Sequence, residues 1–291
     1  MDGIIIINKP IGCTSHDIVY KVKKMFNEKV GHTGTLDPMA EGVLPILVGK
    51  GTLLSKYLIN HNKKYIVELQ LGIKTDTADS EGKIVEQKTI NEEKVSKENI
   101  EKVFQSFIGK QEQMPPMYSA IKVNGKKLYE YARKGQEVEI KPRQIEIYNI
   151  NLIQYSIEKK QIKFEVFCGK GTYIRSLCED IAQRFETVGY MKSLKRIQVG
   201  DFKIEDSITI NQLEENIQDN NFIKDKIISI EKLFNEKIGI KLDNKKLKLF
   251  LNGVRLTQTL NDGIYKIYTE NNIFVGIGVV ESQLLKRDII L

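Results

Sequence analysis

Cysteine is scarce in this chain and is not arranged for disulfides or zinc. The three cysteines are Cys13, Cys168 and Cys178, and no two of them form a C-x-x-C pair. An odd number of widely spaced cysteines is atypical of small secreted domains, where disulfides replace part of the core. The sequence therefore predicts a reducing compartment, the cytoplasm.

Histidine is equally rare, and the ligand patterns of common metal sites are missing. None of the three histidines, His16, His32 and His61, lies in an H-E-x-x-H motif or beside a cysteine pair, which argues against zinc. The acidic stretch DTADSEG has Ala78 where an EF-hand loop needs an acid and Glu81 where it needs glycine. We interpret it as an acidic turn after a strand and expect no metal.

Nucleotide-binding and serine-hydrolase motifs are also missing. GVLPILVGKGT resembles a phosphate-binding loop, but six residues separate Gly42 from Gly49, and a glycine follows Lys50. The Walker A motif needs four residues there and a serine or threonine after the lysine. No G-x-S-x-G elbow is found either.

Long apolar runs are absent. The run Ile4–Ile7 is far too short to span a bilayer and predicts a buried strand. The first residues also lack the basic region and the small-residue cleavage site of a signal peptide. We therefore expect no membrane partner.

The composition suits a globular protein that binds a polyanion. The 291 residues are 41% hydrophobic and 29% charged, with a net charge of +7. This length suits one large domain or two ordinary ones. Excess positive charge favours association with polyanions, although many lysine-rich proteins are basic for no functional reason.

Both helical and alternating apolar patterns occur, which predicts a mixed α/β fold. Helical spacing is found from Thr14 or Ser15 to Phe26, from Ser96 to a stop at Gly109, and from Ile174 to Phe185. Alternation or short apolar runs are found at 4–7, 43–48, 65–71, 145–157 and 162–168. These segments are predicted to be helices and strands, respectively.

The composition changes toward the C-terminus. Residues 205–226 are polar, with EENIQDNN at the centre, and are the best candidate for a boundary region. Beyond them, 239–291 is rich in strand formers, and IYKIYTENNIFVGIGVV (264–280) predicts a hairpin. A unit of about fifty residues is expected to rely on the larger domain for stability.

The loop GHTGTLDP (31–38) carries one acid between two apolar segments. An aspartate before proline is most often a turn former. Here, however, Gly31 and Gly34 permit an unusual backbone or the close approach of a ligand. This setting makes Asp37 a candidate catalytic carboxylate.

A carboxylate used in catalysis needs a cation that keeps it ionised and oriented. Arg175 follows the glycine turn of CGKGTYIR and opens the third predicted helix. An arginine–carboxylate pair is bidentate and lowers the pKa of the acid. The alternative explanation of Arg175 is a solvated helix residue, and the sequence alone does not pair it with Asp37. From its local sequence, Tyr65 is better explained as an aromatic at the edge of the core.

The stretch MYSAIKVNGKKLYEYARKG (117–135) interleaves lysines with tyrosines. Such a pattern suits single-stranded RNA, because lysines meet phosphates and aromatic rings stack on bases. A solvated loop anchored by tyrosines explains the same pattern equally well.

Several long motifs occur together and in order. They are NKPIGCTSHD, GHTGTLDPMAEGVLPI, KKYIVELQLGIKTDTADSEG, QMPPMYSAIKVNGKKLYEYARKG, CGKGTYIRSL and GYMKSLKRIQVGDF. In this order they resemble the bacterial tRNA pseudouridine-55 synthases of the TruB type, over residues 3 to 203. The C-terminal unit has the size and position of that family's small PUA-type RNA-binding domain.

This resemblance implies a fold, an activity and a partner. The fold is a mixed-sheet α/β pseudouridine synthase domain, expected at 1–232, with a small β-rich PUA-like domain at 233–291. The activity is isomerisation of uridine 55 in the T loop of tRNA, without cofactor or metal. The T arm of tRNA is the implied partner, and a monomer is expected because no surplus apolar face is evident.

The resemblance also implies roles for particular residues. Asp37 matches the catalytic aspartate, and Arg175 the arginine that pairs with it. Tyr65 matches the tyrosine that stacks on the target base and is implicated in proton removal. His32 matches the histidine that fills the space of the flipped nucleotide. Leu194 matches an apolar wall of the pocket.

Lys9, with Pro10, belongs to a motif that supports the site, and we group it with the substrate-binding residues.

Three other functions compete with the enzyme. A non-catalytic RNA-binding protein would need the basic surface but not Asp37. A guide-RNA-dependent relative would share the core motifs, but this chain lacks basic tail extensions. A phosphoenzyme hydrolase would need the reverse order of TGTLD and a second acidic motif, which is not evident.

Overall fold

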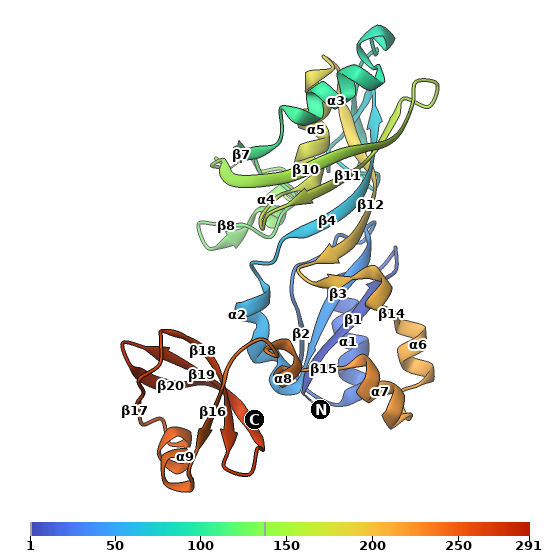
Figure 1. Ribbon diagram of the computed structural model, residues 1–291. Helices are drawn as coiled ribbons and strands as arrows, with labels where there is room; N and C mark the ends of the chain where they lie inside the picture. Colours follow the sequence, from blue (N-terminus) through green and yellow to red (C-terminus); the bar gives the residue numbers. More distant parts are fainter. Residues whose placement is uncertain (1, 137) are drawn as a thin grey trace.

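The computed structural model describes residues 2–136 and 138–291. Two sheets organise these residues: an 11-stranded sheet and a 5-stranded sheet formed by the C-terminal residues. Figure 1 shows the small sheet beside one end of the large unit, with α2 (Ser55–Leu58) and α8 (Ile230–Leu233) at the junction.

The large sheet is mixed, as predicted. Along its path lie β14 (Ile208–Thr209), β1 (Gly3–Lys9), β3 (Glu41–Val48), β12 (Gly189–Val199), β4 (Lys63–Leu71), β11 (Gln161–Cys168), β10 (Arg143–Ser156) and β7 (Gly109–Gln113). Beside this path lie β2 (Val30–His32), β13 (Phe202–Lys203) and β15 (Ile228–Ser229). Most neighbours are antiparallel, but β12 runs parallel to β3, and β1 runs parallel to β14.

The three predicted helices are present. In α1 (Ser15–Phe26), Thr14 and Asp17 form a capping box at the start. The second, α3 (Lys97–Gln105), is capped by Ser96 and ends earlier than expected. Gly109, expected to stop this helix, has a φ of +107° and opens β7 instead. The third, α5 (Ile174–Arg184), carries the residues predicted to be buried.

Short elements complete the large unit. They are η1 (Gly49–Leu54), β5 (Ile73–Thr75), β6 (Ile84–Gln87), η2 (Glu92–Lys94), β8 (Lys122–Val123), β9 (Lys126–Lys127), α4 (Leu128–Ala132), η3 (Ile204–Asp206), α6 (Ile210–Glu215) and α7 (Asn220–Lys226). Strands β5 and β6 pair as one hairpin, and β8 and β9 as another.

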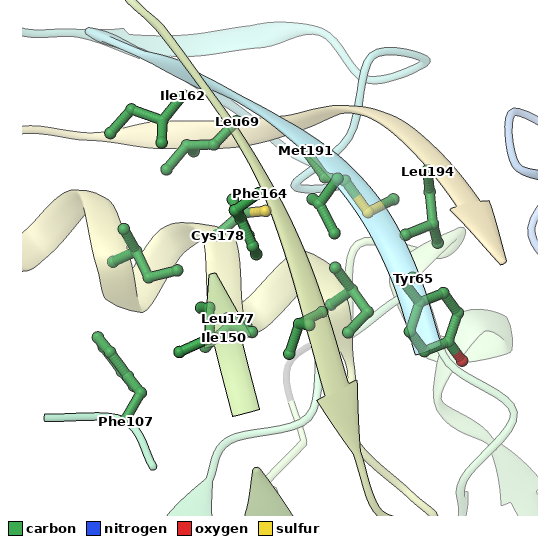
Figure 2. Packing of buried hydrophobic residues seen from close by; sticks show 14 of the residues in the cluster. Tyr65, Leu69, Phe107, Ile150, Ile162, Phe164, Leu177, Cys178, Met191 and Leu194 are labelled. Carbon is green, nitrogen blue, oxygen red and sulfur yellow. The ribbon is translucent and has the colours of Figure 1, made fainter. Parts of the chain in front are cut away.

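The largest hydrophobic cluster of the large unit lies between one face of the sheet and the helices α3 and α5 (Figures 1 and 2). Alternate residues of β4, from Tyr65 to Leu71, point into it, which confirms the predicted strand. Phe164 of β11 packs on Phe104 of α3, with ring centroids 5.2 Å apart. Figure 2 shows Tyr65 at the end of this cluster, beside Leu194.

The polar segment 205–226, the candidate boundary region, folds as part of the large unit. It forms α6 and α7, and Leu213 and Ile223 are buried against Ile5 and Ile7 of β1. The sequence misled because only one face of each short helix is apolar, and the intervening residues are polar. This segment is therefore part of the large unit.

The C-terminal unit contains the predicted hairpin. Its elements are β16 (Gly239–Leu242), α9 (Asn244–Leu251), β17 (Leu256–Thr257), β18 (Gly263–Thr269), β19 (Phe274–Glu281) and β20 (Leu284–Ile290). Its residues Ile277 and Ile289 share an apolar cluster with Ile4 of β1 and Phe234. Asp288 of β20 also accepts hydrogen bonds from Lys56 and from the Tyr57 hydroxyl. The unit is thus docked on the larger one.

Candidate active site

Asp37 lines a cavity of about 480 Å³ at the edge of the core. The cavity is bounded by segments 34–37, 118–120 and 170–175, and by side chains of β4 and β12. Leu36 and Ala40, on either side of Asp37, are buried, so the loop is held to the core at both ends. The acid thus projects from a fixed loop into a hollow.

The structure brings Asp37 and Arg175 together. Nε of Arg175 is 3.1 Å from Oδ2 of Asp37, and Nη2 is 3.4 Å from Oδ1. The arginine side chain is only 7% exposed, whereas the aspartate side chain keeps 34% exposed. The pair is therefore bidentate, with the acid facing the cavity.

The rest of the Arg175 guanidinium is held by the protein. Nη2 donates to the carbonyl of Tyr118 at 2.9 Å, and Nη1 donates to the carbonyl of Thr77 at 3.2 Å. Nη1 also lies 3.7 Å from the buried carboxylate of Asp79. The start of α5 is fixed as well, because Gln113 bonds both the N–H and the carbonyl of Tyr173.

Several groups act on the protonation of Asp37. Burial raises the pKa of Asp37 above its ordinary value, since a carboxylate loses hydration there. The guanidinium of Arg175 opposes this rise most strongly, whereas Asp79 adds to it. Proximity to Arg175 thus keeps the ionised form accessible in a partly desolvated site.

Tyr65 and Leu194 form one apolar side of the cavity. They come from the neighbouring strands β4 and β12, and both are 7% exposed. Figure 2 shows the Tyr65 ring at the end of the cluster, with its hydroxyl pointing away from the other buried side chains. Burial raises the pKa of Tyr65 to about 12, although Arg196 opposes the rise. The hydroxyl therefore keeps its proton at neutral pH.

Arg196 is a site residue that the sequence reasoning missed. It is 1% exposed and donates to the carbonyls of Val43, Gly34 and Thr35 at 2.7, 2.9 and 3.4 Å. It thereby supports the loop that carries Asp37. Simple alternation did not reveal it, because β12 has bulges between Met191 and Ser193 and between Arg196 and Gln198 that break the strand period.

Lys9 lies behind the loop and not on the cavity wall. Its fully buried ammonium donates to the carbonyls of Cys13, Pro10 and Pro38 at 2.7, 2.9 and 3.4 Å. Ser15 is linked to Leu36 through both the N–H and the carbonyl of that residue. The first motif of the chain therefore braces the aspartate loop.

His32 lies on β2, opposite Ile46 of β3, outside the cavity lining. Burial lowers the pKa of His32, with smaller contributions from Arg196 and His16, so the ring is neutral near pH 7. Its Nδ1 is buried and has no hydrogen-bond partner within the described residues. The role expected for His32 stays a prediction.

The acidic turn and two lysines also contribute to the site, and the sequence reasoning missed all three. Asp79, in the turn after β5, is 4% exposed and accepts from Thr77 Oγ1 at 2.6 Å. Lys63 and Lys170 both line the cavity. The lysines lie in the same motifs as Tyr65 and Arg175, but a lysine beside a strand or turn is too common to be singled out.

Within the described residues, no group of three or more His, Cys, Asp and Glu side chains is placed to hold a metal ion. None of the helices formed by these residues has the length and apolar character required to cross a membrane. All three cysteines are free thiols.

The arrangement combines an oriented carboxylate, an aromatic face and a cationic wall. The carboxylate can act as a nucleophile or as a base, since Arg175 fixes its direction. Tyr65 and Leu194 offer an aromatic face and an apolar side chain on one wall of the cavity. Among the described residues, four cationic side chains line the hollow, against one carboxylate, Asp37. The site therefore suits an anionic substrate with a planar ring.

Comparisons with known proteins identify the family of this chain. Residues 22–174 match the N-terminal domain of the TruB family pseudouridylate synthases, 175–235 match the tRNA pseudouridylate synthase B C-terminal domain, and 239–286 match the C-terminal domain of Pseudouridine synthase II TruB. The tRNA pseudouridine synthase B of Clostridium kluyveri is 47% identical over 286 residues, covering 96% of each chain. That of Clostridium novyi is 46% identical, with both chains covered completely.

Solved structures give the same fold. A chain in the crystal structure of a Cbf5-Nop10-Gar1 complex is 25% identical, with a TM-score of 0.68, covering 96% of this chain and 78% of that one. A chain in an H/ACA RNP bound to a substrate RNA containing 2′-deoxyuridine superposes with a TM-score of 0.70 at 22% identity, covering 99% and 85%. From its mixed sheet, its matched domains and its full-length relatives, this chain belongs to the TruB family of pseudouridylate synthases.

Proposed function

We propose that this protein converts uridine 55 in the T loop of tRNA to pseudouridine, with Asp37 as the catalytic carboxylate. The observation that carries the proposal is the bidentate Asp37–Arg175 pair on the wall of a cavity that also presents Tyr65 and Leu194. Relatives named tRNA pseudouridine synthase B at 46–47% identity support the choice of substrate.

The reaction breaks the bond between N1 of uracil and C1′ of the ribose and makes a bond between C5 and C1′. A proton leaves C5 and one is gained at N1, so the product is an isomer. Asp37 can play either of two roles in this reaction. It either attacks covalently and is later displaced, or removes a ribose proton to give a glycal.

Other side chains assist in this scheme. Arg175 holds Asp37 ionised and oriented in a partly dry site, where charge interactions are strong. Tyr65 packs against the uracil and has its hydroxyl near C5, where a proton must leave. Leu194 completes the apolar wall, and Lys9 holds the aspartate loop through the carbonyl of Pro38.

The target base must leave its stack before it reaches Asp37. Extruding a base costs a few kcal/mol. The net charge of +7 favours binding to the RNA backbone and offsets part of that cost. His32 is our candidate for the side chain that takes the vacated space in the RNA.

We infer that residues 1–232 form the catalytic domain and 233–291 a PUA-like RNA-binding domain. The change from the large sheet to the small one after α8 supports this boundary. A monomer that binds the T arm of tRNA in the cytoplasm completes the proposal, and three free thiols suit that reducing compartment.

The test is a direct assay. Purified protein is incubated with unmodified tRNA transcript, without metal, nucleotide or guide RNA, and pseudouridine is mapped by carbodiimide treatment and primer extension. A stop at position 55 is expected with the wild type and not with Asp37→Ala. If neither protein produces a stop but both bind tRNA, the chain is a binding protein or needs a guide RNA.

A further inference from the structure

Four cationic side chains of the described residues line the catalytic cavity, and they differ in how fully the protein itself satisfies them. Arg175 is held by Asp37 and by two carbonyls. Arg196 donates to three carbonyls. Neither arginine can donate a hydrogen bond to a substrate without breaking its contacts with the aspartate loop. The two lysines are different.

Lys63 has one hydrogen bond, from Nζ to the carbonyl of His61 at 2.6 Å. Its charged and titratable neighbours are Arg196, His61 and the thiol of Cys168, and no carboxylate of the described residues forms a salt bridge with it. An ammonium group has three donors, so two remain unused. Lys170 lies on an exposed rim, where it donates to Asn60 Oδ1 at 2.9 Å. Lys63 is therefore the inner, half-buried cation that lacks a counter-ion.

The position of Lys63 relates it to the base-binding wall. Lys63 and Tyr65 are two residues apart on β4, so their side chains share a face of the strand, about 7 Å apart along it. The methylene chain of Lys63 lies against Gly34, since a methyl group added to Gly34 would come within 3.4 Å of Cε of Lys63. The aliphatic part of Lys63 thus lies beside the start of the loop that carries Asp37, at the edge of the cavity.

We propose that Lys63 binds a backbone phosphate next to the target uridine and so places the ribose against Asp37. The proposal rests on the proposed function, because a flipped uridine whose ring packs on Tyr65 carries a phosphate on each side within reach of this strand. Phosphate is the anion that the site otherwise lacks, since Asp37 is already paired with Arg175.

The protonation of Lys63 agrees with a missing partner. Burial lowers the pKa of Lys63 to about 8, and Arg196 adds to this. A buried ammonium without a counter-ion is costly, and an incoming phosphate would remove that cost.

Lys64 offers a matched control. It is the next residue of β4, its side chain is on the opposite face, and Nζ is paired with Glu165 at 3.4 Å. Single-turnover kinetics on tRNA separate binding, read as the half-saturating enzyme concentration, from the maximum rate. We expect Lys63→Gln to raise the half-saturating concentration about tenfold to one-hundredfold. It should also reduce the salt slope of binding by about 1, whereas Lys64→Gln keeps the wild-type slope.

A second experiment changes the substrate and compares its effect on the wild type and on the Lys63→Gln variant. A single uncharged methylphosphonate linkage is placed on either side of uridine 55. One of the two should weaken wild-type binding as much as Lys63→Gln does, and should not weaken the Lys63→Gln variant further. Lys63→Arg should keep the wild-type salt slope.

The proposal is overturned if Lys63→Gln keeps the wild-type salt slope, or if both neutral linkages weaken the variant and the wild type equally. A loss of maximum rate alone would assign Lys63 to the chemical step instead. If the wild type binds tRNA but makes no pseudouridine in the same assay, it is the proposed function that fails.

Discussion

The guanidinium of Arg175 contacts two carboxylates, of which only one faces the cavity. It is bidentate to Asp37, at 3.1 and 3.4 Å, and lies 3.7 Å from Asp79. Asp37 keeps 34% of its side chain exposed and Asp79 only 6%. The two acids share one cation, but only Asp37 can meet a substrate, and this difference makes them a useful pair for mutation.

Replacing Asp37 with asparagine should abolish turnover while leaving the fold intact. We expect a loss of more than about a thousandfold in the maximum rate, because no other carboxylate of the described residues lines the cavity. Asp79→Asn, the same change on the other side of Arg175, should reduce the rate without abolishing it. Equal losses in both variants, measured by single-turnover kinetics, would contradict the assignment of Asp37.

The Asp37→Asn substitution should not lower the urea concentration at the midpoint of unfolding at pH 7. Burial raises the pKa of Asp37 in the folded chain, so its ionised form costs stability once the pH exceeds the pKa of the unfolded chain. Asparagine removes that cost. Urea unfolding of the wild type and of Asp37→Asn, compared at pH 7, should give an equal or higher midpoint for the variant. A clearly lower midpoint would mean that the ion pair is a net source of stability.

The pH dependence of the reaction should report the Asp37–Arg175 pair. If Asp37 acts as a carboxylate, as proposed, activity should fall as the pH drops through the pKa of that group. Because Arg175 holds this pKa down against burial, Arg175→Gln should move the acidic limb of the kcat/KM profile to higher pH. Arg175→Lys keeps the charge and should shift the limb less. Identical limbs in the wild type and the Gln variant would exclude this electrostatic role.

Alanine substitutions at Gly42 and Gly12 should distinguish the cost of a steric clash from the cost of an unfavourable backbone conformation. Gly42 of β3 has a φ of +111°, and a methyl group added there would overlap the backbone carbonyl of Arg196. Gly42→Ala should therefore destabilise the fold by about 3 kcal/mol. Gly12→Ala is the control, since Gly12 has a φ of +86° and a methyl group there would meet nothing within 4 Å. It should cost about 1 kcal/mol. Equal shifts in denaturant midpoint would show that crowding by Arg196 is unimportant.

The junction between the two units offers a further test. The Tyr57 hydroxyl donates to Asp288, and its ring meets Phe234 edge-on at 5.1 Å. Tyr57→Phe keeps the ring and removes the hydrogen bond, so we expect a loss of about 1 kcal/mol. Tyr20→Phe, at a residue that is 66% exposed, should change nothing. Protease cleavage between the units should quicken only in the first variant. Equal cleavage rates would show that the Tyr57 hydroxyl does not help to hold the two units together.

Most of the fold could be predicted because it follows local periodicity. The alternation in β4 and the helical spacing in α1 and α5 each fix which side chains are buried. The order of strands is a different matter. Placing β12 between β3 and β4 depends on contacts between distant segments, and no local pattern contains them.

The candidate site was predicted in part for the same reason. Asp37 and Arg175 stood out because each follows a glycine-rich turn, but their pairing is a contact over 138 residues. Arg196 was missed because a charged residue in a strand is normally expected to face water. Here its charge is met by three carbonyls of the loop and β3, which only the assembled sheet provides.

The bracing of the aspartate loop by the first residues of the chain has a genetic consequence. Lys9 and Ser15 never reach the cavity, yet they tie down the backbone on both sides of Asp37. A random screen for inactive variants should therefore collect substitutions at these two positions alongside those at Asp37. Such alleles would be scored as catalytic although the altered side chain lies outside the cavity, because the damage is a displaced carboxylate.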